Sequence, residues 1–207
     1  GRYGMKALKT FTLLTASTML MAGSVFAVGP VGKTWVGATG GLEQYDEDLD
    51  DGAFGSIDAN VSLAPNLDVF GGTGFATADG PGVEVEGTQS EVGLRLVLDG
   101  GGPIVPYAQA ALLYQDAEAK FKDDLETTKE DDDDVGYGAG AGLPFSPCAW
   151  STIEVGVAYA DVFDDDSTAV EAAVGAVLGD NFQLWVGGAY DLDDEATTET
   201  LSLNLLF

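Results

Sequence analysis

The chain has 207 residues, of which 35 are acidic and only 8 are basic, so its formal net charge is −27. This balance excludes nucleic acid as a partner, because phosphate binding needs a basic surface, and it makes a bare anionic lipid surface a poor partner. The single cysteine, Cys148, cannot form an internal disulfide, and we expect it in a turn without chemistry.

Residues 1–27 have the pattern of a processing segment. From Met5, two lysines precede a short apolar stretch diluted by Ser and Thr, and a Val-Phe-Ala site ends at Ala27. This order is typical of a secretory signal peptide, whereas the alternative, a membrane anchor, needs a longer apolar run. Residues 1–4 form a leader without an interpretable signal. We therefore predict one domain over residues 28–207, with 5 basic residues against 35 acidic ones.

From residue 33 onward, apolar residues recur at every second position, which indicates half-apolar β-strands. In SIDANVSLA, for example, Ile57, Ala59, Val61 and Leu63 alternate with polar residues. The pattern predicts ten strands, at 33–45, 55–64, 67–77, 88–98, 104–115, 134–145, 150–161, 167–178, 182–192 and 196–207. Most are about 10–12 residues long, which is the length that a tilted strand needs to cross a bilayer.

Short turns rich in Gly, Pro, Asn and Asp alternate with longer polar segments between these strands. The expected turns are 64–66, 99–102, 146–149 and 179–181, and the expected loops are 46–54, 78–87, 116–133, 161–166 and 193–195. An even number of antiparallel strands with this alternation is typical of a closed, up-and-down transmembrane β-barrel of the outer membrane. The pattern favours this fold over the alternative, a soluble β-sandwich, whose strands are usually shorter.

Three stretches resemble the small outer-membrane β-barrels of Gram-negative bacteria, the OmpA-like β-barrel superfamily. They are PYAQAALLY (106–114), GYGAGAGL (136–143) and the closing LSLNLLF (201–207). In that family the barrel-assembly machinery recognises a terminal Phe preceded by alternating apolar residues, here Leu201, Leu203, Leu205 and Phe207. The resemblance implies a location in the cell outer membrane, among its lipids and lipopolysaccharide. It leaves eight strands as the alternative to ten, because the simplest members of the family have eight.

The sequence offers no catalytic constellation. Small barrels that are enzymes resemble one another in depending on a histidine, and this chain has none, which removes the commonest general base. The acidic run DEDLDDG (46–52) fails the calcium-loop pattern, because Gly52 is seventh rather than sixth and Ile57 stands where Glu is needed. We expect no enzyme activity, no cofactor and no dedicated metal site. Loose binding of divalent cations at the acidic loops, near lipopolysaccharide, is the remaining metal hypothesis.

Inward-facing charges carry the main functional hypothesis. If the apolar faces meet lipid, the charged residues facing the lumen are Asp58, Asp68, Glu91, Arg95, Glu154 and Glu171. Arg95 is the only arginine after residue 27, and a buried charge is costly unless it is paired. Asp68 or Glu154 is its expected partner. The cluster of Arg95 with Asp68, Glu91, Glu154 and Glu171 is either a structural ion pair that fills the lumen or a constriction that selects cations.

A glycine stripe points to the same interior. Gly136, Gly138, Gly140 and Gly142 share one face of their strand. They either leave room for a bulky inward side chain, such as Trp35, Tyr107 or Trp185, or mark strong curvature.

The expected function is therefore that of a structural barrel or of a porin-like, narrow and weakly cation-selective pore. The alternative is a ligand-binding or adhesive barrel that acts through the segment 116–133, which is rich in charge.

Overall fold

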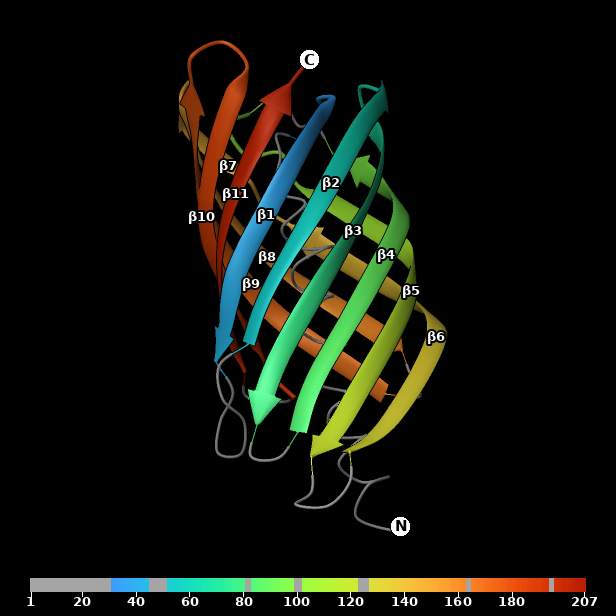
Figure 1. The fold of residues 1–207 in the computed structure, drawn as a ribbon. Coiled ribbons are helices and arrows are strands. Elements are labelled where there is room, and N and C mark those ends of the chain that lie inside the picture. The colour runs from blue at the N-terminus through green and yellow to red at the C-terminus, as the bar shows by residue number, and fades with distance from the viewer. Residues whose placement is uncertain are drawn as a thin grey trace.

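The computed structural model describes residues 31–44, 52–80, 83–98, 102–122, 127–162, 165–193 and 196–207. The predicted signal peptide, 1–27, and nearly all of the acidic run 46–52 lie outside these residues. The elements of the described ranges are strands (Figure 1): β1 Trp35–Gln44, β2 Gly52–Ala64, β3 Leu67–Gly80, β4 Val83–Val97, β5 Tyr107–Lys122, β6 Thr127–Gly142, β7 Phe145–Cys148, β8 Ser151–Val162, β9 Asp165–Leu178, β10 Phe182–Asp191 and β11 Thr197–Leu206. Over these ranges, no helix has the length and apolar character that crossing a membrane requires.

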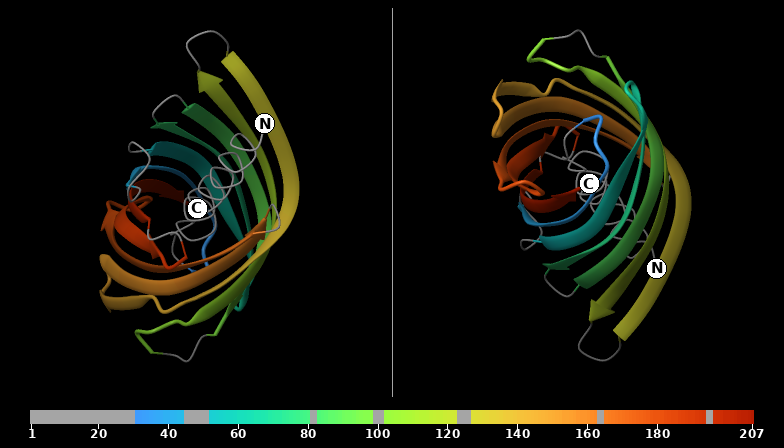
Figure 2. Two further views of the ribbon diagram at one scale, coloured as in Figure 1. Left: turned by 90° about the horizontal axis from the view of Figure 1, so that it is seen from below. Right: turned by 90° about the horizontal axis from the view of Figure 1, so that it is seen from above.

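Ten of the strands form a closed barrel in which neighbours in the chain pair antiparallel. The first and last strands close it, with Trp35 of β1 opposite Leu206 of β11 at one end and Gln44 opposite Thr197 at the other (Figure 2). The short β7 pairs with β8 at the end of the barrel, so β6 and β8 are neighbours in the wall. The predicted up-and-down barrel of ten strands is confirmed, and the alternative with eight strands is wrong.

Side-chain alternation gives the barrel an apolar exterior and a polar interior. On β11 and directly after it, the outward Leu201, Leu203 and Phe207 are 54%, 48% and 76% exposed, whereas the inward Ser202 and Asn204 are each 2% exposed. Similar alternation on the other strands exposes many further outward residues, among them Ile57, Val92, Leu94, Leu112, Val155, Val174 and Val186. An apolar surface of this extent requires lipid, and a closed sheet satisfies the backbone in a bilayer. The chain is therefore a transmembrane barrel.

Glycines on the inner wall make room for aromatic rings. Gly142 on β6 lies opposite Tyr107 on β5, and a Cβ at Gly142 would lie 2.5 Å from the Tyr107 ring. Gly175 on β9 stands in the same relation to Trp185 on β10, at 2.5 Å. At these positions only glycine leaves the space that the neighbouring ring occupies, so the glycine stripe provides room for Tyr107, one of the two predicted roles.

Four strands, β3 to β6, continue into segments where the sequence predicted loops. β5 runs to Lys122 and β6 begins at Thr127, with Asp116 opposite Asp133 in the ladder, so most of the predicted loop 116–133 is strand. The predicted loop 78–87 is also mostly strand, because β3 ends at Gly80 and β4 begins at Val83. The prediction was wrong because it relied on polarity, whereas the two-residue period continues: Ala117 and Ala119 face inward and are buried.

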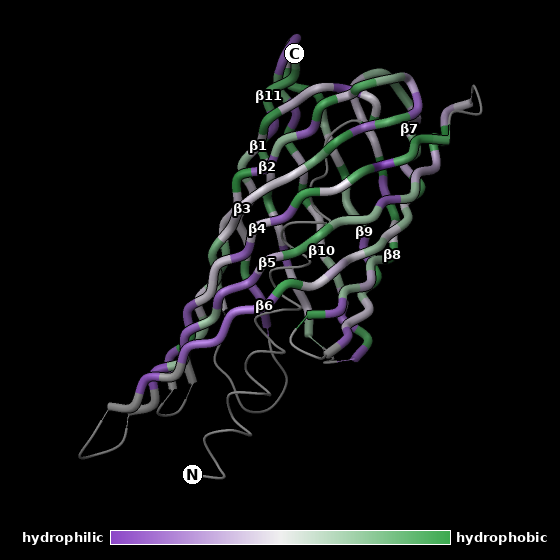
Figure 3. Tube along the Cα trace, turned by 90° about the vertical axis from the view of Figure 1, so that its right-hand side faces the viewer, coloured by the Kyte–Doolittle hydropathy of each residue, from purple (hydrophilic) through white to green (hydrophobic). Residues whose placement is uncertain are grey.

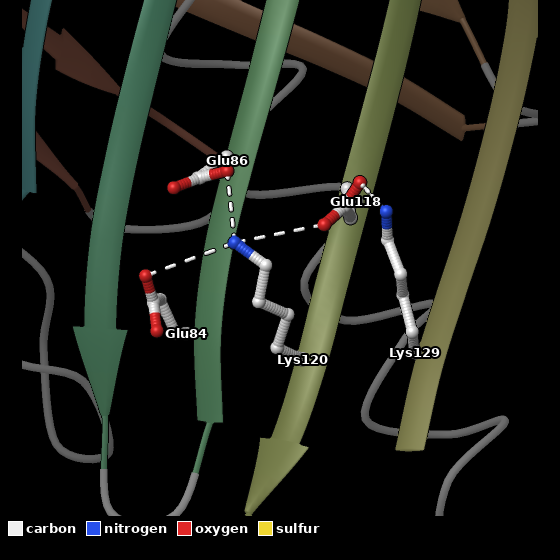
Figure 4. A network of polar contacts seen from close by, with 5 residues as sticks. All are labelled: Glu84, Glu86, Glu118, Lys120 and Lys129. Carbon is white, nitrogen blue, oxygen red and sulfur yellow. Dashed lines mark hydrogen bonds and ion pairs between the residues drawn. The ribbon is translucent and has the colours of Figure 1, made fainter. Parts of the chain in front are cut away.

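We call this region the acidic extension; it comprises residues 83–88, 116–122 and 127–134. Its strand ends are hydrophilic in Figure 3. Its outward side chains are held by ion pairs around two lysines (Figure 4). The Lys120 Nζ lies 3.0 Å from Glu86, 3.6 Å from Glu118 and 3.9 Å from Glu84, and Lys129 also pairs with Glu118. These contacts connect β4, β5 and β6 beyond the lipid.

Candidate functional site in the barrel lumen

Arg95 is fully enclosed on the inner wall of β4. It is 2% exposed, and it lies between Asp68 on β3 and Gln109 on β5 in the strand ladder. Its Nε donates a hydrogen bond of 3.0 Å to the Gln109 Oε1. Its guanidinium carbon lies 4.7 Å from the centre of the Tyr107 ring and 5.3 Å from that of Phe70, distances at which a cation is attracted by an aromatic ring.

Acidic side chains approach this arginine from several strands. The Tyr107 hydroxyl donates a hydrogen bond of 2.5 Å to Glu154 on β8, and Arg95 interacts electrostatically with Glu91 on β4, Glu154 and Glu171 on β9. Because β4 and β9 lie in opposite parts of the wall, the cluster spans the lumen. The structure thus brings together Arg95, Glu91, Glu154 and Glu171.

Asp68, the other predicted member of this cluster, is the cross-strand neighbour of Arg95 and is fully buried. Its Oδ2 accepts a hydrogen bond of 2.9 Å from the Gly32 N–H. Of the two expected partners of Arg95, Asp68 is therefore its neighbour on the adjacent strand and binds the backbone that precedes β1. Glu154 lies on β8, across the lumen.

Three further side chains belong to the site, although the sequence does not indicate that they contact Arg95. Gln109, Tyr107 and Phe70 contact the guanidinium directly. Alternation marks all three as inward-facing, but the sequence carries no signal for which inward side chains meet across the lumen.

A cavity of about 280 Å³ opens at the end of the barrel that carries the 179–181 turn. Lys33, Glu154, Gln183 and Trp185 are among its lining residues. Glu154, a member of the cluster, therefore lines this cavity.

The described ranges contain no group of three or more His, Cys, Asp or Glu side chains arranged to hold a metal ion. The acidic runs 131–134 and 165–166 lie at the extension end of β6 and β9, as parts of strands. Cys148 ends β7, beside a turn, and its Sγ lies 2.9 Å from the Ser151 Oγ.

The closing strand presents the predicted assembly residues to the outside. Leu201, Leu203 and Phe207 are exposed on the outer wall, and Leu205 is half-buried. The Phe207 N–H donates a hydrogen bond of 3.0 Å to the Thr34 carbonyl, next to the start of β1. The segment that carries the family-like pattern thus also closes the barrel.

The fold is similar to that of solved bacterial barrels. The translocator domain of the autotransporter NalP from Neisseria meningitidis has a TM-score of 0.55 and 8% identity, covering 100% of this chain and 97% of its own. The transport unit of the autotransporter AIDA-I from Escherichia coli has a TM-score of 0.53 and 13% identity, covering 93% of this chain and 97% of its own. The beta domain of the Bordetella autotransporter Brka has a TM-score of 0.53 and 14% identity, covering 86% of this chain and 100% of its own. No protein-family model and no curated protein matches the sequence. The likeness concerns the fold, which is that of Gram-negative outer-membrane β-barrels.

Proposed function

We propose that this outer-membrane β-barrel is a narrow passage that prefers cations and has no enzyme activity. The observation that carries the proposal is the acidic excess where side chains from opposite walls meet. Glu91, Glu154 and Glu171 each interact electrostatically with Arg95, so three acids share one guanidinium in this part of the lumen. Rings of acidic side chains favour cations in a pore, because their negative charge attracts cations and repels anions.

The position of Arg95 supports a fixed constriction. Its hydrogen bond to Gln109 and its contacts with two rings hold the guanidinium against the β3–β5 side of the wall. The acids on β8 and β9 then face it across the lumen, and the cavity at the turn end reaches Glu154.

Single-channel recording in planar bilayers tests the passage. In a KCl gradient, the reversal potential of the wild-type barrel should show a preference for potassium over chloride. Arg95→Met keeps a long apolar stem between the rings and should raise the cation preference and the conductance. Glu154→Gln keeps an acceptor for Tyr107 and should lower the preference. Glu86→Gln, on the outer face of the acidic extension, is the matched control and should change neither quantity.

The passage is contradicted if the wild-type barrel leaves the membrane silent, or if chloride carries most of the current. A selectivity that responds equally to Glu154→Gln and Glu86→Gln would show that bulk charge, and not the lumen cluster, sets the preference.

A second candidate function is binding of a partner through the acidic extension. In the ranges that the structure describes, β6 forms ladder pairs with β8 over 137–142, whereas 127–133 has its ladder partners on β5. A strand edge of this kind can accept an extended segment as a further strand. Because Asp131, Asp132 and Asp133 are exposed along it, a lysine-rich extended peptide is the complementary partner.

The pairing of β5 with β6 allows a deletion that tests this second function. Asp116 and Asp133 are cross-strand partners, so an Asn-Gly turn can replace 117–132 and close the hairpin. The shortened barrel should keep its heat-modifiable gel mobility but lose binding of a synthetic peptide with alternating Lys and Val. Asp131→Asn combined with Asp133→Asn should weaken that binding while keeping the edge. Equal binding by the shortened and the full barrel would contradict the adhesive role.

The same proposal includes the partners that the family resemblance implies. We expect the barrel-assembly machinery to read β11, so Phe207→Ala should reduce the folded yield in cells, whereas Ser202→Ala, on the inner face, should leave it unchanged. Lipids and lipopolysaccharide would surround the apolar belt. Loose binding of divalent cations would involve the exposed acids of the acidic extension, and unchanged thermal stability in millimolar calcium would contradict it.

A further inference from the structure

Two acidic residues face each other across a glycine in the middle of the inner wall. Asp58 on β2 lies opposite Gly72 on β3, and Gly72 lies opposite Glu91 on β4, so the three form one row across adjacent strands. A Cβ at Gly72 would lie 2.2 Å from the Asp58 Oδ1. The Asp58 carboxyl therefore leans over the glycine toward the strand that carries Glu91.

This row contains buried acceptor oxygens without donors. Asp58 is 2% exposed and Glu91 is 7% exposed. The Asp58 Oδ2 accepts hydrogen bonds from the Ser56 Oγ at 2.7 Å and from the Thr39 Oγ1 at 3.4 Å. The Asp58 Oδ1 and both oxygens of Glu91 have no hydrogen-bond partner. Leaving buried polar atoms unsatisfied costs free energy, and each such atom in a native protein needs an explanation.

Electrostatics point to a cation. Asp58 and Glu91 are close enough to repel each other. Arg95 attracts Glu91, but it lies four residues further along β4, where it bonds Gln109 and packs against two rings. A positive ligand between the two carboxyl groups would remove the repulsion and satisfy the three oxygens together.

We propose that Asp58 and Glu91 bind a divalent cation that keeps part of its water shell. Hard cations take carboxylate oxygens, and Mg²⁺ in particular is commonly held by one or two carboxylates while it retains several waters. This lumen site differs from the loose binding at the acidic extension, where Lys120 and Lys129 already pair with the glutamates. The inference deepens the proposed function and rests on it in one respect, that cations reach the lumen.

Calorimetric titration of MgCl₂ into the refolded barrel in detergent, at constant ionic strength, tests the site. The wild-type barrel should show one saturable site. Glu91→Gln and Asp58→Asn should each weaken it at least tenfold, because each removes one of the two charges. Asp116→Asn removes an exposed carboxylate from the acidic extension and should leave the affinity unchanged. If Glu91→Gln does not refold, Asp58→Asn carries the comparison, since its amide oxygen can still accept from Ser56 and Thr39.

The absence of a saturable site in the wild-type barrel would overturn the inference, and so would an equal loss of binding in Asp116→Asn and Glu91→Gln. Conductance is measured in KCl without divalent ions, so the two proposals fail separately. A barrel that conducts but does not bind Mg²⁺ overturns the site alone, and one that binds Mg²⁺ but does not conduct overturns the passage alone.

Discussion

The Tyr107 hydroxyl on β5 donates a hydrogen bond of 2.5 Å to Glu154 on β8, passing over β6. The bond crosses β6 beside Gly142, which lies directly opposite Tyr107 and has no side chain to obstruct the ring. The same ring lies 4.7 Å from the Arg95 guanidinium. One tyrosine thus connects the glycine stripe, the arginine and an acid on the facing wall.

Tyr107→Phe should destabilise the barrel by about 1–3 kcal/mol, because the buried Glu154 carboxylate loses its donor. Urea unfolding in lipid vesicles measures the loss. Tyr114→Phe, on the exposed outer wall, is the control and should have a smaller effect. Equal effects of the two substitutions would show that the Tyr107 bond does not stabilise the lumen.

Gly93→Ala should cost about 1–3 kcal/mol of unfolding free energy through overpacking. A Cβ at Gly93 would lie 2.3 Å from the Phe70 Cζ and 2.6 Å from the Ala110 carbonyl oxygen. The ring would have to move away from Arg95, so the selectivity of the passage should change as well. Gly102→Ala places its Cβ in open space and should leave stability and selectivity unchanged. A Gly93→Ala barrel as stable as the wild type would contradict the close packing at Phe70.

The ion pairs of the acidic extension should be sensitive to pH at both ends of the scale. The hydrogen bond from Lys129 lowers the pKa of the Glu118 carboxyl below its ordinary 4.5. Its stabilising contribution is present above pH 4.5 and is lost as the pH falls through the lowered value. The hydrogen bond with Glu86 raises the pKa of Lys120 above 10.5, so its contribution is present below 10.5 and is lost as the pH rises through the raised value.

Lys129→Met should therefore raise the pKa of Glu118, measured by ¹³C NMR titration of the carboxyl carbon. Lys33→Met, at the other end of the barrel, is the control and should leave that titration unchanged. The effect on global stability should be small and should decrease with added salt, because water reaches the paired side chains, which are partly exposed. An unchanged pKa of Glu118 in the Lys129→Met barrel would contradict the ion pair between Lys129 and Glu118.

Cys148 should react faster with alkylating agents near neutral pH than a free cysteine does. The hydrogen bond with the Ser151 hydroxyl lowers the pKa of the thiol, which lies at the end of β7 outside the apolar belt, and the thiolate is the reactive form. Ser151→Ala should shift the pH profile of iodoacetamide labelling upward. Thr152→Ala, whose hydroxyl contacts Ser146 instead, should leave the profile in place. Identical profiles for the Ser151→Ala and wild-type barrels would contradict the role of this bond.

The sequence by itself favoured ten strands over eight in the barrel wall and indicated the face on which each side chain lies, but it placed the ends of β3, β4, β5 and β6 several residues short and did not indicate β7. The reason is local: an extended chain places successive side chains on opposite faces, so the two-residue period of Leu201, Leu203 and Leu205 is visible without the fold. The inner-face positions of Arg95 and Glu154 follow from the same rule. Alternation also holds at Ala117 and Ala119, which face inward on β5, but the polar composition of the segment 116–133 led to the prediction of a loop there.

Only the tertiary structure decided which inward residues meet. Contacts across the lumen depend on the tilt and stagger of the closed sheet, and these determine that Tyr107 reaches Glu154 past β6. The row that joins Asp58 to Glu91 depends on the same stagger, because a shift of two residues at Gly72 would place different side chains beside them. Alternation along a strand is encoded by neighbours in the chain, whereas register around a barrel is set by all of its strands together.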